Sequence, residues 1–270
     1  MDYFLSAIER TVFEIVILFG GVFMLATMLW FASQRLRGDG YSRFGRAYVY
    51  FVAPGVVCHE TGHALGCILT GTRIVEFVPF RLSGNELGYV THERRETFFG
   101  QIANFFIGTG PVWFGCLMIF LLARFLGGRD LLEGLETLAP QSGGSILGYC
   151  FSVLNGAAWM LKSVFVPSNW GSIRFPVGFY LIFCIASEIT LSPPDLQSTW
   201  RGFASLLALI FMLNLVPLVS SWFCLIVDGM MLFLYMFHSL LLFVLLFDLI
   251  LLLAVWLIRR AYLTGRSRRW

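Results

Sequence analysis

The residues with the clearest chemical potential lie at 56–65, where the sequence reads VVCHETGHAL. His59 and His63 stand four positions apart, and Glu60 follows the first histidine. On a helix, side chains at positions i and i+4 share one face, so the two imidazoles can bind one metal ion. Glu60 lies beside them, where it can act as a general base on a water molecule. The pattern therefore predicts one Zn²⁺ per chain, with His59 and His63 as ligands and Glu60 as the catalytic residue.

The setting of this motif is unusual, because it lies inside a long apolar run at 47–69. Charged side chains near the centre of a bilayer cost about 2.5–3.5 kcal/mol each on insertion scales. Such groups usually face a protein interior and mark a functional site. The alternative interpretation is a structural cluster in which the same three side chains only bond to one another. The depth of the motif favours chemistry within a membrane.

The composition of the whole chain supports a membrane location. Hydrophobic residues make up 58% of the 270 residues, charged residues only 13%, and the mean hydropathy is +0.78. Soluble globular domains carry roughly 25% charged residues. We therefore expect an integral, multi-pass membrane protein with one domain, in contact with the lipid bilayer.

Arginines gather after the first apolar run and at the end of the chain. They are Arg35, Arg37, Arg43 and Arg46 in the first group, and Arg259, Arg260, Arg266, Arg268 and Arg269 in the second. Short basic flanks tend to stay in the cytoplasm, which is a commoner role for such clusters than nucleic-acid binding. We expect a protein of the cell membrane, with a cytoplasmic C-terminus and no nucleic-acid partner.

The order of apolar segments predicts an all-α polytopic membrane protein with six to seven transmembrane helices. The segments are expected at about 11–33, 47–70, 98–126, 145–166, 175–191, 200–227 and 230–258. The single domain, 1–270, divides into a first helix and basic loop at 1–46, a catalytic core at 47–200, and C-terminal helices with a basic tail at 201–270.

One connection differs from an ordinary loop. Residues 72–92 are too polar to span a membrane, and two β-prone stretches flank Ser83-Gly84-Asn85. This strand, turn and strand pattern predicts a small membrane-associated β-hairpin directly after the helix that carries the histidines.

Several motifs of this chain together resemble the site-2 protease family of intramembrane zinc metalloproteases. The most specific is HETGHALGCILTG at 59–71; VEFVPF at 75–80, GYV at 88–90 and GTGP at 108–111 support it. The resemblance covers residues 47–126 in order. It implies peptide-bond hydrolysis inside the membrane, and a zinc ion held by two histidines and an aspartate from a later helix. It also implies that an extended substrate adds to an edge strand near the site.

The third ligand is open, because the chain lacks the proline–leucine–aspartate spelling usual in that family. Asp195 is the first choice, since it follows two prolines that break the chain between apolar segments. Asp228 lies well after Pro217 and is a lower-ranked alternative, as is Glu188, which would complete a site with two histidines and one glutamate.

The predicted function is that of a zinc-dependent metalloendopeptidase whose substrate is a membrane protein or peptide. One alternative is a catalytically inactive binding or regulatory protein with the same fold. A transporter is a weaker alternative, since transporters often carry paired repeats and the HETGH segment has no second copy. The sequence predicts no oligomeric state.

Overall fold

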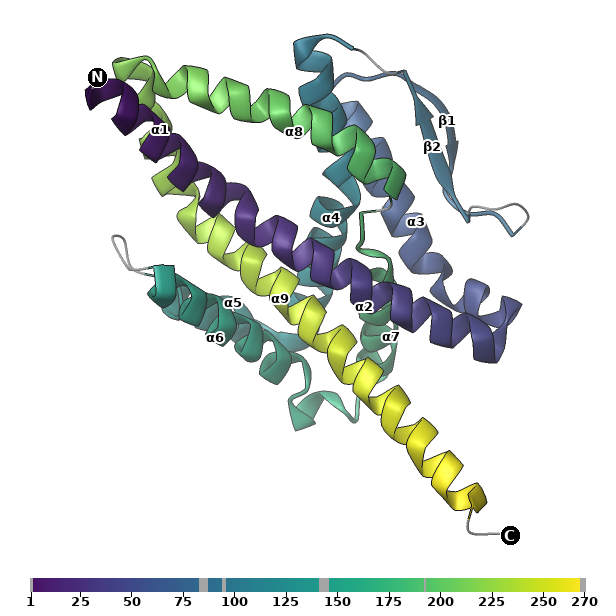
Figure 1. The fold of residues 1–270 in the computed structure, drawn as a ribbon. Coiled ribbons are helices and arrows are strands. Elements are labelled where there is room, and N and C mark those ends of the chain that lie inside the picture. Colours follow the sequence, from purple (N-terminus) through teal and green to yellow (C-terminus); the bar gives the residue numbers. More distant parts are fainter. Residues whose placement is uncertain (1, 83–86, 94–95, 141–145, 192, 268–270) are drawn as a thin grey trace.

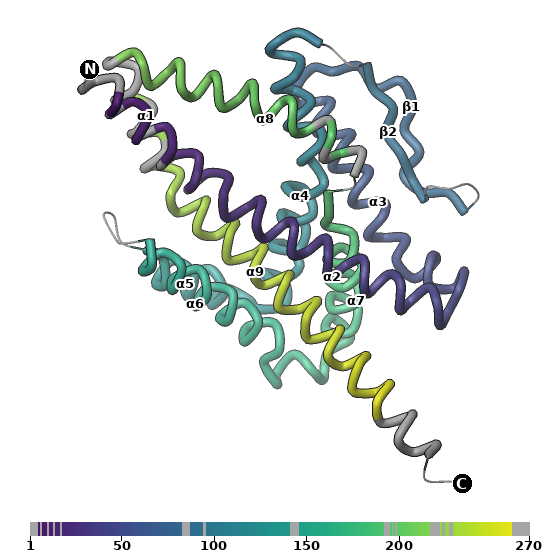
Figure 2. Tube along the Cα trace, in the orientation of Figure 1, coloured from purple at the N-terminus to yellow at the C-terminus, as the bar shows by residue number. Residues whose placement is uncertain are grey.

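The computed structural model of the chain describes residues 2–82, 87–93, 96–140, 146–191 and 193–267 (Figures 1 and 2). It is 83% helical, with one small antiparallel sheet of two strands. Its elements, in chain order, are α1 (Asp2–Ile15), the π-helical turn η1 (Val16–Gly20), α2 (Gly21–Phe44), α3 (Arg46–Leu69), β1 (Ile74–Val78), β2 (Tyr89–His92), α4 (Phe98–Gly127), α5 (Asp130–Thr137), α6 (Ile146–Val164), the 3₁₀ turn η2 (Pro167–Asn169), α7 (Arg174–Glu188), α8 (Pro193–Asn214) and α9 (Pro217–Ser267).

Within the described ranges, three helical segments are long and apolar enough to cross a membrane. They are Phe98–Gly127, Ile146–Asn169 and Gly229–Arg260. They support the membrane character that the composition predicts. The expected total of six to seven spans stays a prediction.

The expected boundaries hold in the middle of the chain. Helices α3, α4 and α6 begin and end within a few residues of the predicted segments, and α7 is short, as expected. The strands β1 and β2 confirm the hairpin, with Phe77 opposite Val90 and Val78 opposite Tyr89. The turn predicted at 83–85 lies outside the described residues.

The prediction for the N-terminal region was wrong. Instead of a basic loop after the apolar run at 11–33, α1, η1 and α2 follow one another without a break as far as Phe44. Arg35, Arg37 and Arg43 therefore lie on a helix. The helix ends at Gly45, whose positive φ of 53° favours glycine, and α3 begins at the next residue.

The predicted boundary at 227–230 was also wrong. Helix α8 ends at Asn214, and α9 begins at Pro217 and continues through Gly229 to Ser267. Proline lacks an amide hydrogen and pushes the residue before it away from helical conformation, so Pro217 ends one helix and begins the next. A single glycine such as Gly229 costs a helix only about 1 kcal/mol, which the rest of α9 tolerates.

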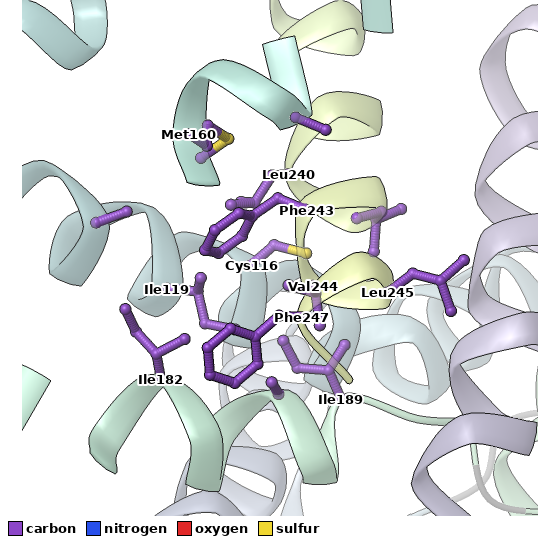
Figure 3. Close-up of a cluster of buried hydrophobic side chains, with 14 of the residues drawn as sticks. Cys116, Ile119, Met160, Ile182, Ile189, Leu240, Phe243, Val244, Leu245 and Phe247 are labelled. Carbon is purple, nitrogen blue, oxygen red and sulfur yellow. The ribbon is translucent and has the colours of Figure 1, made fainter. Parts of the chain in front are cut away.

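The main hydrophobic core joins α4, α6, α7 and α9. Figure 3 shows residues from these helices interlocking around Phe243 and Phe247 of α9, and α2 adds Leu25 and Leu29 to the same cluster. Phe243 is fully buried. The core anchors the long helix α9, and α4 and α7 extend from it toward the helix with the histidines.

Helices α3 and α4 approach unusually closely through glycines. A Cβ atom added at Gly62 would lie 2.6 Å from the Cα of Pro111, and one at Gly66 would lie 2.8 Å from the Cα of Ile107. Gly62 and Gly66 form the small-xxx-small pattern that lets helix backbones meet in membranes. The contact brings the backbone of α4 within hydrogen-bonding distance of α3 side chains.

We expect Gly62→Ala to lower the free energy of unfolding by about 1–3 kcal/mol, because the new methyl group forces the two helices apart. The control is Gly38→Ala on α2, where an added Cβ meets nothing within 4 Å. That control should be neutral or raise stability by roughly 0.5–1 kcal/mol. Unfolding in mixed detergent micelles measures both variants, and equal stability of the two would contradict the close α3–α4 contact.

Candidate metal centre

Three side chains from two helices converge beside the hairpin. His59 and His63 lie on α3, and Asp195 lies in the first turn of α8. The Nε2 atom of His63 is 3.3 Å from Oδ1 of Asp195, and the Nε2 atom of His59 is 3.8 Å from Oδ2. The side chains are only 10–17% exposed. The structure thus brings together the two histidines and the carboxylate that was the first choice for the third ligand.

Each imidazole forms a hydrogen bond to a backbone carbonyl through Nδ1, the ring nitrogen that does not face Asp195. The Nδ1–H group of His59 donates to the carbonyl oxygen of Glu188 at 2.8 Å, and that of His63 donates to the carbonyl oxygen of Ile107, also at 2.8 Å. A carbonyl oxygen can only accept, so Nδ1 carries the hydrogen in both rings. The lone pair of each neutral ring is then on Nε2, the atom that faces Asp195. Such outer contacts typically fix the tautomer and the orientation of metal-binding histidines.

The donor set of two imidazoles and one carboxylate suits a small divalent ion, and the two distances to Asp195 are compatible with tetrahedral coordination. The candidate ligand atoms of all three residues lie within 4.8 Å of one another, so the cluster could hold a metal ion. Zinc bonds of 2.0–2.2 Å at tetrahedral angles imply ligand-to-ligand distances of about 3.4 Å. The two nitrogen-to-oxygen distances bracket that value. Two imidazoles and one carboxylate leave the fourth position of such a site for water or substrate.

The two alternative ligands have different placements. Glu188 is buried, but its Oε2 atom lies 3.2 Å from Nη1 of Arg37, and it is the backbone carbonyl that accepts a hydrogen bond from His59. Its carboxylate does not belong to the three-residue cluster. Asp228 lies on α9, and its side chain falls outside the described residues.

Glu60 is buried beside the cluster, under the hairpin. A Cβ atom added at Gly88 would lie 2.6 Å from Cγ of Glu60 and 2.9 Å from the carbonyl oxygen of Pro79. The chain entering β2 therefore packs directly on the predicted general base, where no side chain larger than glycine fits. Figure 1 shows the hairpin beside α3.

Sequence reasoning missed the groups behind the histidines. The carbonyl of Ile107 did leave a signal in the sequence: Pro111, four residues later in α4, has no amide hydrogen to donate to it, so this carbonyl can accept from His63. The glycines that admit α4 were also visible. Arg37 was interpreted only as part of a basic loop. Its contact with Glu188 depends on the unbroken helix from α1 to α2, which the apolar pattern did not predict.

In comparisons with protein-family models, with curated proteins and with solved structures, none matched this chain. The geometry of the cluster and the sequence motifs are therefore the basis for any functional conclusion.

We expect Asp195→Ala to weaken zinc binding by more than tenfold, because loss of an outer partner alone already costs about 10–100-fold. Zinc content and affinity are measured by mass spectrometry and chelator competition on purified protein. Asp130→Ala, which removes an exposed acidic residue of α5, is the control and should bind like the wild type. Retention of zinc by Asp195→Ala together with its loss from Asp228→Ala would assign the third ligand to Asp228.

Proposed function

We propose that this chain is an intramembrane zinc metalloendopeptidase, similar to the site-2 protease family, which hydrolyses peptide bonds of membrane-embedded proteins. The observation that carries the proposal is the convergence of Asp195 on His59 and His63 from a distant part of the sequence. The burial of Glu60 next to this cluster supports it, because a hydrolase needs a base within reach of its water.

The roles of the residues follow from their chemistry. His59, His63 and Asp195 would hold the ion through two Nε2 atoms and a carboxylate oxygen. A bound zinc ion would supply Lewis-acid activation of water and of the scissile carbonyl. Glu60 takes a proton from the water as the new C–O bond forms, and then delivers that proton to the amine nitrogen, so that the C–N bond breaks and the amine leaves. The carbonyls of Glu188 and Ile107 keep both imidazoles in the required tautomer.

The position of the hairpin favours the binding of an extended substrate beside the predicted general base, Glu60. A helical peptide bond is shielded and already hydrogen-bonded, so a membrane substrate must unwind before attack. An unwound segment can add to an exposed strand edge through backbone hydrogen bonds. Among the residues that the structure describes, β1 and β2 form a two-stranded sheet, and Gly88, just before β2, lies against Glu60. A peptide paired with this sheet would run close to the general base.

The membrane arrangement is part of the same proposal. We place the protein in the cell membrane as a multi-pass protein with six to seven spans. The arginines at and after the end of the apolar part of α9, such as Arg259 and Arg260, favour a cytoplasmic C-terminus.

The decisive variant is Glu60→Gln, which keeps the size of the side chain and removes the base. We expect it to bind zinc like the wild type and to lose cleavage by at least about 100-fold, a typical contribution of general-base catalysis. Proteoliposomes carrying a library of single-span peptides with helix-breaking residues, analysed by mass spectrometry, provide the assay.

Three results of this assay would contradict the proposal. Cleavage by Glu60→Gln equal to wild type would remove Glu60 from the mechanism. Zinc binding without cleavage in the wild type would favour an inactive regulatory protein with this fold. Zinc-dependent ion flux across the same liposomes without cleavage would favour a transporter.

A further inference from the structure

The C-terminal end of α7 serves the candidate metal centre in two ways. The carbonyl of Glu188, its last residue, accepts the Nδ1–H group of His59. The few residues after Glu188 lead directly into α8, which presents Asp195 in its first turn. One short connection therefore joins the residue whose carbonyl contacts His59 to the helix that carries Asp195.

Arg37 of α2 forms hydrogen bonds to two residues at this connection. Its Nη1 group donates to Oε2 of Glu188 at 3.2 Å, and its Nη2 group donates to Oγ1 of Thr190, also at 3.2 Å. The Thr190 side chain is almost fully buried, and its amide donates to the carbonyl of Glu188 at 2.8 Å. The guanidinium thus bridges the residues on both sides of Ile189, while that carbonyl accepts from both His59 and Thr190.

The packing around Ile189 is a second restraint on the connection. Ile189 is buried, and a Cβ atom added at Gly115 of α4 would lie 2.5 Å from its Cγ1 atom. Contacts of α4 with Ile189 and of Arg37 with its two neighbours restrain residues 188–190. A planar guanidinium suits such a bridge because its donors are fixed relative to one another, whereas a lysine offers a single point of attachment.

The burial of Glu188 gives the pair a further role. The side chain of Glu188 is 8% exposed, and its Oε1 atom has no hydrogen-bond partner within the part of the chain that the structure describes. A buried carboxylate needs a compensating charge, and Arg37 supplies it from another helix. Without Arg37, the buried Glu188 carboxylate would lack its compensating charge. We expect its side chain to turn toward water or another cation and to shift the backbone that carries its carbonyl.

We propose that Arg37 is a positioning residue of the metal centre: its bridge to Glu188 and Thr190 holds the α7–α8 connection so that His59 and Asp195 face the same point. This inference rests on the proposed function only in taking zinc as the ion. Arg37 does not touch the ion or the substrate, and its effect on them passes through the backbone of residues 188–190.

The test compares zinc affinity, by chelator competition, in purified wild-type protein, Arg37→Ala and Arg37→Lys. We expect Arg37→Ala to weaken affinity about 10–100-fold, as for other outer partners of metal ligands, and Arg37→Lys to restore only part of the loss. Two matched controls should bind like the wild type. Arg43→Ala removes an exposed arginine of the same helix, and Arg73→Ala breaks the exposed pair with Glu93.

A double-mutant cycle separates the bridge from direct ligation by Glu188. If the Glu188 carboxylate affects zinc binding only by its contact with Arg37, its removal has no further effect once Arg37 is absent. The double variant Arg37→Ala with Glu188→Gln then binds zinc no more weakly than Arg37→Ala alone. If Glu188 is itself a ligand, Glu188→Gln weakens affinity strongly while Arg37→Ala leaves it near the wild-type value. That second result would overturn the inference.

A metal-free measurement keeps the inference independent of the proposed function. Hydrogen exchange of the zinc-stripped protein should show faster exchange at the amides of 189–190 in Arg37→Ala than in Arg43→Ala, with equal protection in α4. Equal exchange of the connection in both variants would overturn the bridge. Failure of the wild type to bind zinc, with this difference intact, would contradict the proposed function alone. If Arg37→Ala does not fold, Arg37→Lys and Arg37→Gln are compared in the same way.

Discussion

The candidate metal centre depends on two hydrogen bonds, each from an imidazole to a backbone carbonyl, and the helices around it must place those carbonyls. His59 and His63 present Nε2 to a common point only because the carbonyls of Glu188 and Ile107 hold their Nδ1–H groups. A carbonyl on α4 can reach α3 only where the backbones almost touch, and Gly62 and Gly66 allow that approach. The other carbonyl lies at the end of α7, where helical carbonyls lack intrahelical partners and remain available. Because α7 ends at Glu188, the carbonyl of that residue is available to accept from His59.

The same constraint explains why so many polar groups lie close together inside an apolar protein. A buried carboxylate or imidazole is costly unless another group compensates for it. Asp195 faces two imidazole Nε2 atoms that a cation can bridge to its carboxylate, and Glu188 faces Arg37. The two sets are connected through one peptide carbonyl, so the arginine helix α2 and the histidine helix α3 act on the same point. In the proposed enzyme, a divalent cation would complete the compensation at the first set.

The sequence was sufficient where local patterns decide the structure. The i, i+4 spacing of His59 and His63 and the prolines before Asp195 predicted which side chains meet, and two β-prone stretches around a turn in 72–92 predicted the hairpin. It was insufficient where tertiary contacts or single residues override the apolar pattern. Helix α9 begins at Pro217, earlier than the apolar pattern predicted. Helix α2 continues well past the apolar run, so that Arg37 reaches the site. The carbonyl of Glu188 lies at a helix end that the apolar pattern does not locate to the residue. Pro111, by contrast, already marked the carbonyl of Ile107 as an acceptor without an intrahelical donor.

The central claim is that His59, His63 and Asp195 form the coordination shell of one zinc ion. Zinc-edge X-ray absorption spectroscopy of the purified wild-type protein tests this most directly. We predict only nitrogen and oxygen neighbours at about 2.0–2.2 Å, with the multiple-scattering signature of two imidazoles. Sulfur at about 2.3 Å, which would implicate a neighbour such as Cys58, or a shell with fewer than two imidazoles, would contradict the account.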